Sequence, residues 1–175
     1  NFRNYGPPAS SPVIISVYNN DDFGLVSTFF LTPPEGTSKG DLMVLYTLYD
    51  RNGTATVPSG WTPHFNYSGG GTYKNSFIVC SKFATLSDLT TSFDVDFSVA
   101  SAGTIGIISL SNVNITTPVI TGSGVSTVTN NTVFDINQAG AGTINSMNIL
   151  IANIEFLSSG TATPTAGWTL RGGLN

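Results

Sequence analysis

Short runs in which apolar and polar residues alternate dominate the chain, and clusters of Gly, Pro, Asn and Asp separate them. The runs are rich in Val, Ile, Phe, Tyr and Thr, and a period of two residues with this composition indicates β-strands. A helical period is almost absent. Strands are predicted at residues 13–18, 25–31, 42–49, 73–84, 92–99, 104–111, 119–121, 132–136 and 147–156, with a short helical turn at 85–89.

Two of these runs show how the strands are expected to pack. From residue 92 to residue 99 the odd positions are apolar, whereas the even positions include Asp94 and Asp96. Side chains alternate across a strand, so one face of this run is predicted to be buried and the other hydrated. From residue 147 to residue 156 both alternating sets are largely apolar, which predicts a central strand.

The spacing of strands and turns predicts the fold class. Brief strands joined by Gly-rich and Asn-Gly steps are typical of β-sandwiches and jelly rolls. We therefore expect an all-β, antiparallel, jelly-roll-like β-sandwich with little or no helix. Residues 1–12 hold Pro7, Pro8 and Pro12 with little alternation, and they are predicted to form an extended arm. Residues 13–175 are predicted to form one domain, since 175 residues suit a single sandwich.

Composition narrows the classes of function. Charged residues make up 9% of the chain, the net charge is -4 and the pI is near 4.5. Six scattered Lys and Arg residues argue against a nucleic-acid partner, because phosphate neutralisation needs clustered cations. An apolar stretch long enough for a transmembrane helix is absent from the sequence, so no membrane partner is expected. The exterior must be hydrated mainly by hydroxyl, amide and backbone groups, as is common in secreted proteins and virion shells.

A short sequence motif of Pro, Gly and Trp occurs twice, at Pro58-Ser59-Gly60-Trp61-Thr62 and at residues 164–169. Upstream of the first copy, residues 34–44 combine a Pro-x-Gly turn, a Gly40-Asp41 step and a hydrophobic strand. This order resembles a β-sandwich module of bacteriophage virion structural proteins, of the head-decorating or tail-appendage type. The resemblance runs from about Val13 to Trp168.

The resemblance implies a non-enzymatic component of a virion surface, either a capsid decoration protein or a tail appendage. Its partners would be other virion proteins, through self-association or through the major capsid or tail protein. Modules of this kind continue for a further strand or two after the second Gly-Trp-Thr, whereas this sequence stops at Asn175. We expect the chain to be a fragment or a neighbouring subunit to complete the edge, since an unpaired edge invites pairing.

The residues that could carry chemistry are few. His64 is the single His and Cys80 the single Cys, so a metal site built from several thiolates or imidazoles is not expected. The sequence motif that surrounds a catalytic serine in many hydrolases is also absent. Cys80 lies in an apolar run, where a small buried side chain is expected. Asp94 with Asp96, or Asp21 with Asp22, could bind calcium, but solvated acids are favoured. We expect no catalytic, cofactor-binding or metal-binding residues.

Aromatic side chains gather around one predicted loop region. Trp61, Tyr67 and Tyr73 are the candidate glycan contacts there, with Phe65 between them in sequence. If exposed, these rings could stack on sugars, and the chain would then be a carbohydrate-binding or adhesin module. The competing interpretation, which we favour, places Trp61 and Phe65 in the core and the tyrosines at its rim.

Overall fold

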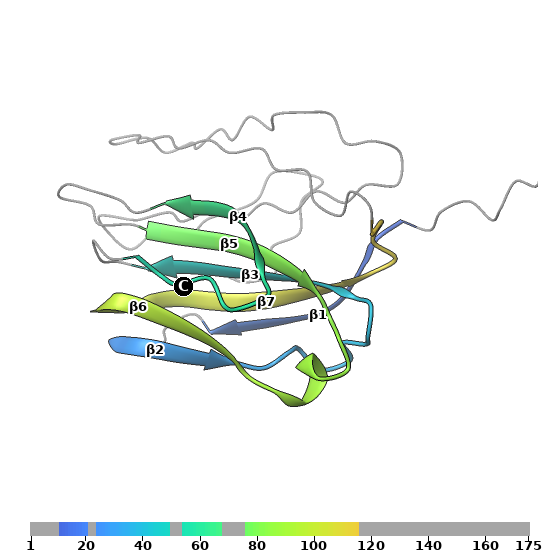
Figure 1. Ribbon diagram of the computed structural model, residues 1–175, viewed down its shortest axis with the longest axis horizontal. Helices are drawn as coiled ribbons and strands as arrows, with labels where there is room; N and C mark the ends of the chain where they lie inside the picture. Colours follow the sequence, from blue (N-terminus) through green and yellow to red (C-terminus); the bar gives the residue numbers. More distant parts are fainter. Residues whose placement is uncertain (1–10, 21–23, 50–53, 68–75, 116–175) are drawn as a thin grey trace, which may run out of the picture.

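The computed structural model describes residues 11–20, 24–49, 54–67 and 76–115, and these form two antiparallel β-sheets (Figure 1). The larger sheet has five strands in the order β1-β7-β3-β5-β4, and the smaller one pairs β2 with β6. The strands are β1 Val13–Asn20, β2 Val26–Leu31, β3 Leu42–Tyr49, β4 Thr62–Tyr67, β5 Ser76–Phe83, β6 Phe93–Ser101 and β7 Gly103–Ser111, with a 3-10 helix η1 at Asp88–Thr90.

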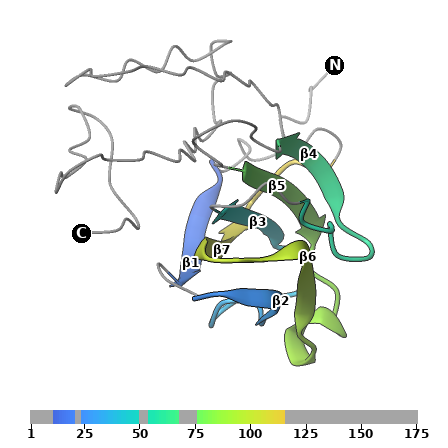
Figure 2. The same cartoon turned by 90° about the vertical axis from the view of Figure 1, so that its left-hand side faces the viewer.

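The smaller sheet is extended by the segment that precedes β4. Ala55 forms an isolated antiparallel bridge to Phe97. The backbone N–H of Thr56 donates to the carbonyl of Asp96 at 2.8 Å, and the N–H of Ser98 donates to the carbonyl of Thr54 at 2.9 Å. β6 therefore has a hydrogen-bonded neighbour on both sides, and the smaller sheet lies across one face of the larger (Figure 2).

The main core fills the space between the two sheets. Alternation places Phe93, Val95 and Phe97 of β6 in this core, and Asp94 and Asp96 on the other face are exposed. The prediction of a buried face is wrong at Val99, which is exposed near the end of the strand. Tyr49 meets Phe97 edge-on, with ring centroids 5.1 Å apart. The buried side chains of this core are Leu31, Met43, Leu45, Tyr49, Ala55, Trp61, Ile78, Cys80, Ala84, Phe93, Val95, Phe97, Ile105 and Ile107.

β3 is buried on both of its faces. It pairs with β5 on one side and with β7 on the other, with Leu45 opposite Cys80 and Ile107. Its residues 42–46 are all apolar, as expected of a central strand covered on both sides. The face that points away from the smaller sheet carries a second buried cluster of Leu42, Val44, Tyr46, Ile108 and Leu110.

The chain passes from the smaller sheet to the larger at Gly103. β6 ends at Ser101 and β7 begins at Gly103, where φ is +155°. A Cβ atom at this position would lie 2.0 Å from the carbonyl oxygen of Leu48. Glycine is required here because β7 must approach the backbone of β3 more closely than any side chain permits.

The predicted fold class is confirmed: the described residues form an all-β structure of antiparallel sheets, without an α-helix. η1 overlaps the end of the predicted helical turn at 85–89 and extends one residue past it. The sequence predicted no strand at β4, so that interpretation was incomplete. Predicted strands 119–121, 132–136 and 147–156 lie outside the described residues, as do residues 1–10 of the predicted arm. The jelly-roll connectivity stays a prediction.

Candidate functional site

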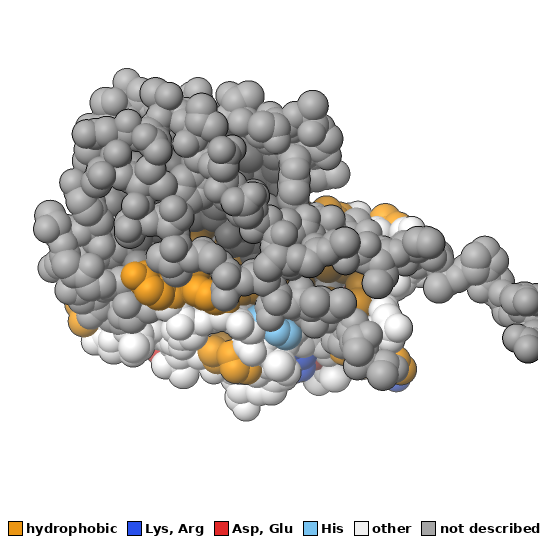
Figure 3. Space-filling view, turned by 90° about the horizontal axis from the view of Figure 1, so that it is seen from above, with side chains coloured by type: hydrophobic (Ala, Val, Ile, Leu, Met, Phe, Trp, Pro, Cys, Tyr) orange, Lys and Arg blue, Asp and Glu red, His pale blue; other side chains and the backbone are white. Residues whose placement is uncertain are grey.

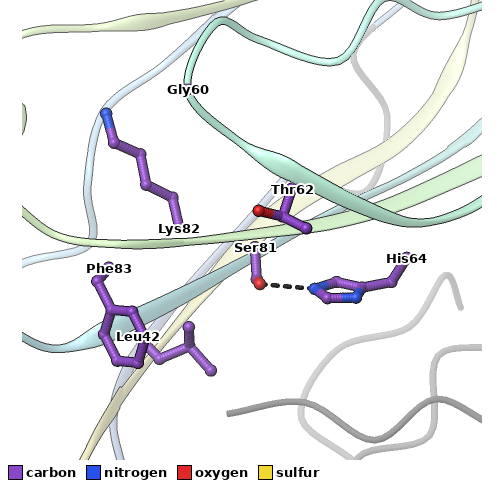
Figure 4. Close-up of a pocket in the computed structure, with 7 residues that line it drawn as sticks. All are labelled: Leu42, Gly60, Thr62, His64, Ser81, Lys82 and Phe83. Carbon is purple, nitrogen blue, oxygen red and sulfur yellow. Dashed lines mark hydrogen bonds between the residues drawn. The ribbon is translucent and has the colours of Figure 1, made fainter. Parts of the chain in front are cut away.

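A pocket of about 400 Å³ lies where β4 runs beside β5 (Figure 4). His64 of β4 and Ser81 of β5 point toward each other there, whereas the Lys82 side chain points away from them. The described part of the chain contains no helix that could span a membrane. The residues that line the pocket are Leu42, Gly60, Thr62, His64, Ser81, Lys82 and Phe83.

A bulge in β4 directs His64 onto Ser81. Pro63 pairs with Cys80 and Phe65 pairs with Val79, so His64 is an extra residue in the ladder. Pro63 has no N–H to give to a neighbouring strand, and β4 is an edge strand, where such a residue is tolerated. A bulge of this kind re-aims one side chain relative to regular alternation.

His64 and Ser81 form a short hydrogen bond. His64 Nε2 lies 2.6 Å from Ser81 Oγ, and the tautomer of the ring decides which group donates. Burial lowers the pKa of His64 below its ordinary value of 6.5, so the imidazole is neutral at neutral pH. Ser81 is buried, and no carboxylate among the described residues bonds to the ring. The two residues therefore form a neutral pair without the acid of a catalytic triad within the described ranges.

Acidification is expected to weaken the fold through His64. Because its pKa is lower in the folded chain, the unfolded chain binds more protons, and this contribution to stability is present above pH 6.5 and lost as the pH falls below it. The urea midpoint of the chain should therefore fall between neutral pH and about pH 5.5, and that of His64→Gln should fall less. Equal pH dependence in the two proteins would contradict this account.

Lys82 ties β5 to the turn that follows it. Its Nζ lies 2.7 Å from Asp88 Oδ1 and 5.7 Å from the ring centroid of Phe93. The backbone N–H and the hydroxyl of Thr85 donate to Asp88 Oδ2. Burial alone would raise the pKa of Asp88, but the hydrogen bonds from Lys82 and Thr85 and the Lys82 charge lower it overall. This ion pair is a structural contact that fixes the β5–β6 connection. Both carboxylate oxygens of Asp88 are already hydrogen-bonded, to Lys82 and to Thr85.

Of the candidate glycan contacts, the structure describes Trp61 and Tyr67. Trp61 is 6% exposed and packs edge-on against Phe93 at 5.1 Å, so its burial removes it from any glycan platform. Tyr67 is half-buried on β4, and Tyr73 lies outside the described residues.

Of the acidic residues considered for calcium, Asp94 and Asp96 are exposed, and Thr28 Oγ1 donates to Asp96 at 2.7 Å. Asp21 and Asp22 fall outside the described ranges.

Sequence reasoning missed a row of stacked rings on β4 and β5. The rings of Phe65 and Phe77 are nearly parallel, with an interplanar angle of 10° and centroids 4.3 Å apart, and Tyr67 lies 6.0 Å from Phe77. A predicted pairing of residues 62–67 with 77–81 would have brought these rings together. Pro63 and His64 interrupt the alternation in 62–67, so the sequence did not indicate a strand there. Because Phe65 and Phe77 cover each other, one face of each ring is closed to a sugar.

Cys80 is buried, and its side chain belongs to the main core. Burial raises the pKa of the thiol to about 12, so the thiolate is not available at neutral pH. This confirms the prediction of a small buried side chain. Figure 3 shows the β4 side of the molecule, where the His side chain (pale blue) lies among hydrophobic and other uncharged groups, with a basic side chain (blue) nearby.

The edge strands β1 and β2 expose several large hydrophobic side chains. Neither strand carries a charged residue, and both lie toward the lower side of the molecule in Figure 1. The Ser16 hydroxyl of β1 donates to the carbonyl of Glu35, in the connection between β2 and β3, at 2.6 Å, which ties β1 to that connection. We call Val13, Ile15, Tyr18, Leu25 and Phe30 the exposed edge residues.

No protein-family model matches the chain, and the searches of curated proteins and of solved structures give no match either.

Proposed function

We propose that the chain is a non-enzymatic structural module of a bacteriophage virion surface, acting as a capsid decoration protein or a tail appendage. Its partners are other copies of itself or the major capsid or tail protein, and its location is the outside of the particle. The repeated Pro, Gly and Trp motifs suggested a virion structural protein, and contacts between proteins are the activity that the described residues support best.

The exposed edge residues are the observation that carries the proposal. Phe30 is 64% exposed on a strand without charge. Edge strands of monomers are usually protected by Lys, by Pro or by bulges, because open edges pair with other chains. β1 and β2 each contain an irregularity, between Ile14 and Ser16 and between Val26 and Thr28. These bulges disfavour continuation of the sheet into a neighbour, so the contacts are made by side chains.

The carbohydrate-binding alternative has less support from the described residues. It relied on Trp61, Tyr67 and Tyr73 as a platform, and Trp61 belongs to the core. Tyr67 and Phe77 are half-buried beside Phe65, so the described rings offer little open aromatic surface. Binding of the purified chain to a glycan array that Tyr67→Ala abolishes would favour this alternative over the structural module.

Detection of the chain on particles tests the proposal. Phage particles are purified on a density gradient from cells that make the chain, and antibodies against the purified chain are applied to them. We expect the chain to band with the particles, and immunogold labelling to mark either the head or the tail. A chain found in the soluble fraction alone, with unlabelled particles, would overturn the proposal.

A further inference from the structure

The smaller sheet has a face that points away from the main core, and we call it the Phe30 face. Phe29 and Val95 pair across the two strands and pack in or against the main core, so the residues on either side of them point outward. The described side chains of this face are Thr28, Phe30, Asp94, Asp96, Ser98 and Thr56. They include two carboxylates and one phenyl ring, and neither Lys nor Arg is among them.

Phe30 and Asp94 are neighbours on this face. The register pairs them directly, and side chains in such a pair are in reach of each other. Phe30 is 64% exposed and Asp94 is exposed as well. The carboxylate of Asp96 accepts a hydrogen bond from Thr28, whereas among the described residues none engages the carboxylate of Asp94. An open ring and an open carboxylate therefore lie side by side.

The protein itself shows which group such a pair binds. Lys82 Nζ lies 2.7 Å from Asp88 Oδ1 and 5.7 Å from the centroid of the Phe93 ring. The carboxylate takes a charge-assisted hydrogen bond from the ammonium, and the ring face attracts its positive charge. Phe30 and Asp94 present the same two groups without a cation, so their chemistry selects a Lys or Arg side chain of a partner.

Lys39 is an exposed cation on a well-fixed turn between β2 and β3. The N–H of Asp41 donates to the carbonyl of Ser38 at 3.1 Å, and the N–H of Ser38 donates to Asp41 Oδ2 at 2.8 Å. Gly40 supplies the positive φ, +94°, that the third position of this turn requires. No carboxylate in the described ranges bonds to Lys39. A fixed backbone leaves mainly the Lys39 side chain to be ordered when it binds a partner.

We infer that a second copy of the chain places Lys39 against Phe30 and Asp94. The Phe30 face carries negative charge alone, and Lys39 supplies the complementary charge. The inference rests on the proposed function, which includes self-association among its contacts. The exposed edge residues supply apolar contact area, and the Lys39–Asp94 pair fixes how the two copies are oriented, which is the usual role of charge complementarity at an interface.

A charge swap in the full chain tests this inference. Lys39→Glu, Asp94→Lys and the double variant that carries both changes are compared with the unmodified chain by sedimentation velocity over a concentration series. Both residues are exposed, so folding should be retained, and circular dichroism verifies it. Each single reversal places like charges together and should weaken association by about tenfold or more, while the double variant should recover to within about threefold of the unmodified chain.

Glu35→Lys is the matched control, because it makes the same charge change at an exposed residue outside the Phe30 face. It should leave association unchanged. If the unmodified chain associates but neither reversal weakens it, or if the double variant is no better than the single ones, the inference is wrong and the proposed function stands. A monomeric unmodified chain would also overturn the inference, whereas labelling of particles decides the proposed function separately.

Discussion

Gly103→Ala is expected to destabilise the fold by about 4 kcal/mol, a large part of the stability of a domain of this size. The new methyl group would meet the carbonyl oxygen of Leu48 and the Cα of Tyr49, which belong to the central strand and cannot move without breaking ladder hydrogen bonds. Equilibrium unfolding in urea, followed by circular dichroism, measures the loss.

Gly40→Ala separates the cost of the backbone angle from the cost of the clash. Gly40 also has a positive φ, +94°, but a Cβ at this position has open space around it. Its loss is expected to be about 1 kcal/mol, the ordinary cost of a positive φ for alanine. If both variants lose the same amount, close approach between β7 and β3 is not what requires Gly103.

Trp61→Ala is expected to cost about 3–5 kcal/mol, as is usual when a large aromatic side chain is removed from a core. Trp61 contacts Phe93 in the main core, and its Nε1 is buried without a hydrogen-bond partner among the described residues. The change therefore removes packing and leaves a cavity, while no hydrogen bond is lost. Urea unfolding gives the free energy of unfolding of both proteins.

Trp61→Phe is the matched variant and should lose clearly less stability than Trp61→Ala. A phenyl ring keeps part of the packing against Phe93 and removes the unpaired indole N–H, which is itself costly to bury. A fully stable Trp61→Ala chain would place Trp61 outside the core and would restore it as a candidate glycan contact.

Much of the strand pattern could be predicted because strand formation depends on local alternation. Residues 42–49 were predicted with the bounds that β3 has, and Phe93, Val95 and Phe97 lie in the core as their period of two indicated. β4 escaped prediction because Pro63 and His64 interrupt alternation, and the bulge that accommodates them depends on pairing with β5, which the pattern within β4 does not specify.

The partners of each strand and the contacts of His64 were beyond sequence reasoning. β3 lies between β5 and β7 because side chains far apart in the chain fit together, and a period of two does not specify that choice. Local pattern favoured Trp61 and Phe65 as core residues, with Tyr67 at the rim. The structure confirms this for Trp61, which packs against Phe93, whereas Phe65 is half-buried and stacks on Phe77 outside the main core.

The central claim is that this module acts through uncharged side chains on its edge strands, and sedimentation velocity tests it most directly. The unmodified chain is compared with the double variant Ile15→Lys and Phe30→Lys, and with Leu86→Lys, which changes an exposed residue of the turn after β5. Lysine on an edge strand opposes association at little cost to folding. The account predicts oligomers for the unmodified chain and for Leu86→Lys, and a monomer for the double variant. A monomeric unmodified chain, or a double variant that associates unchanged, would contradict it.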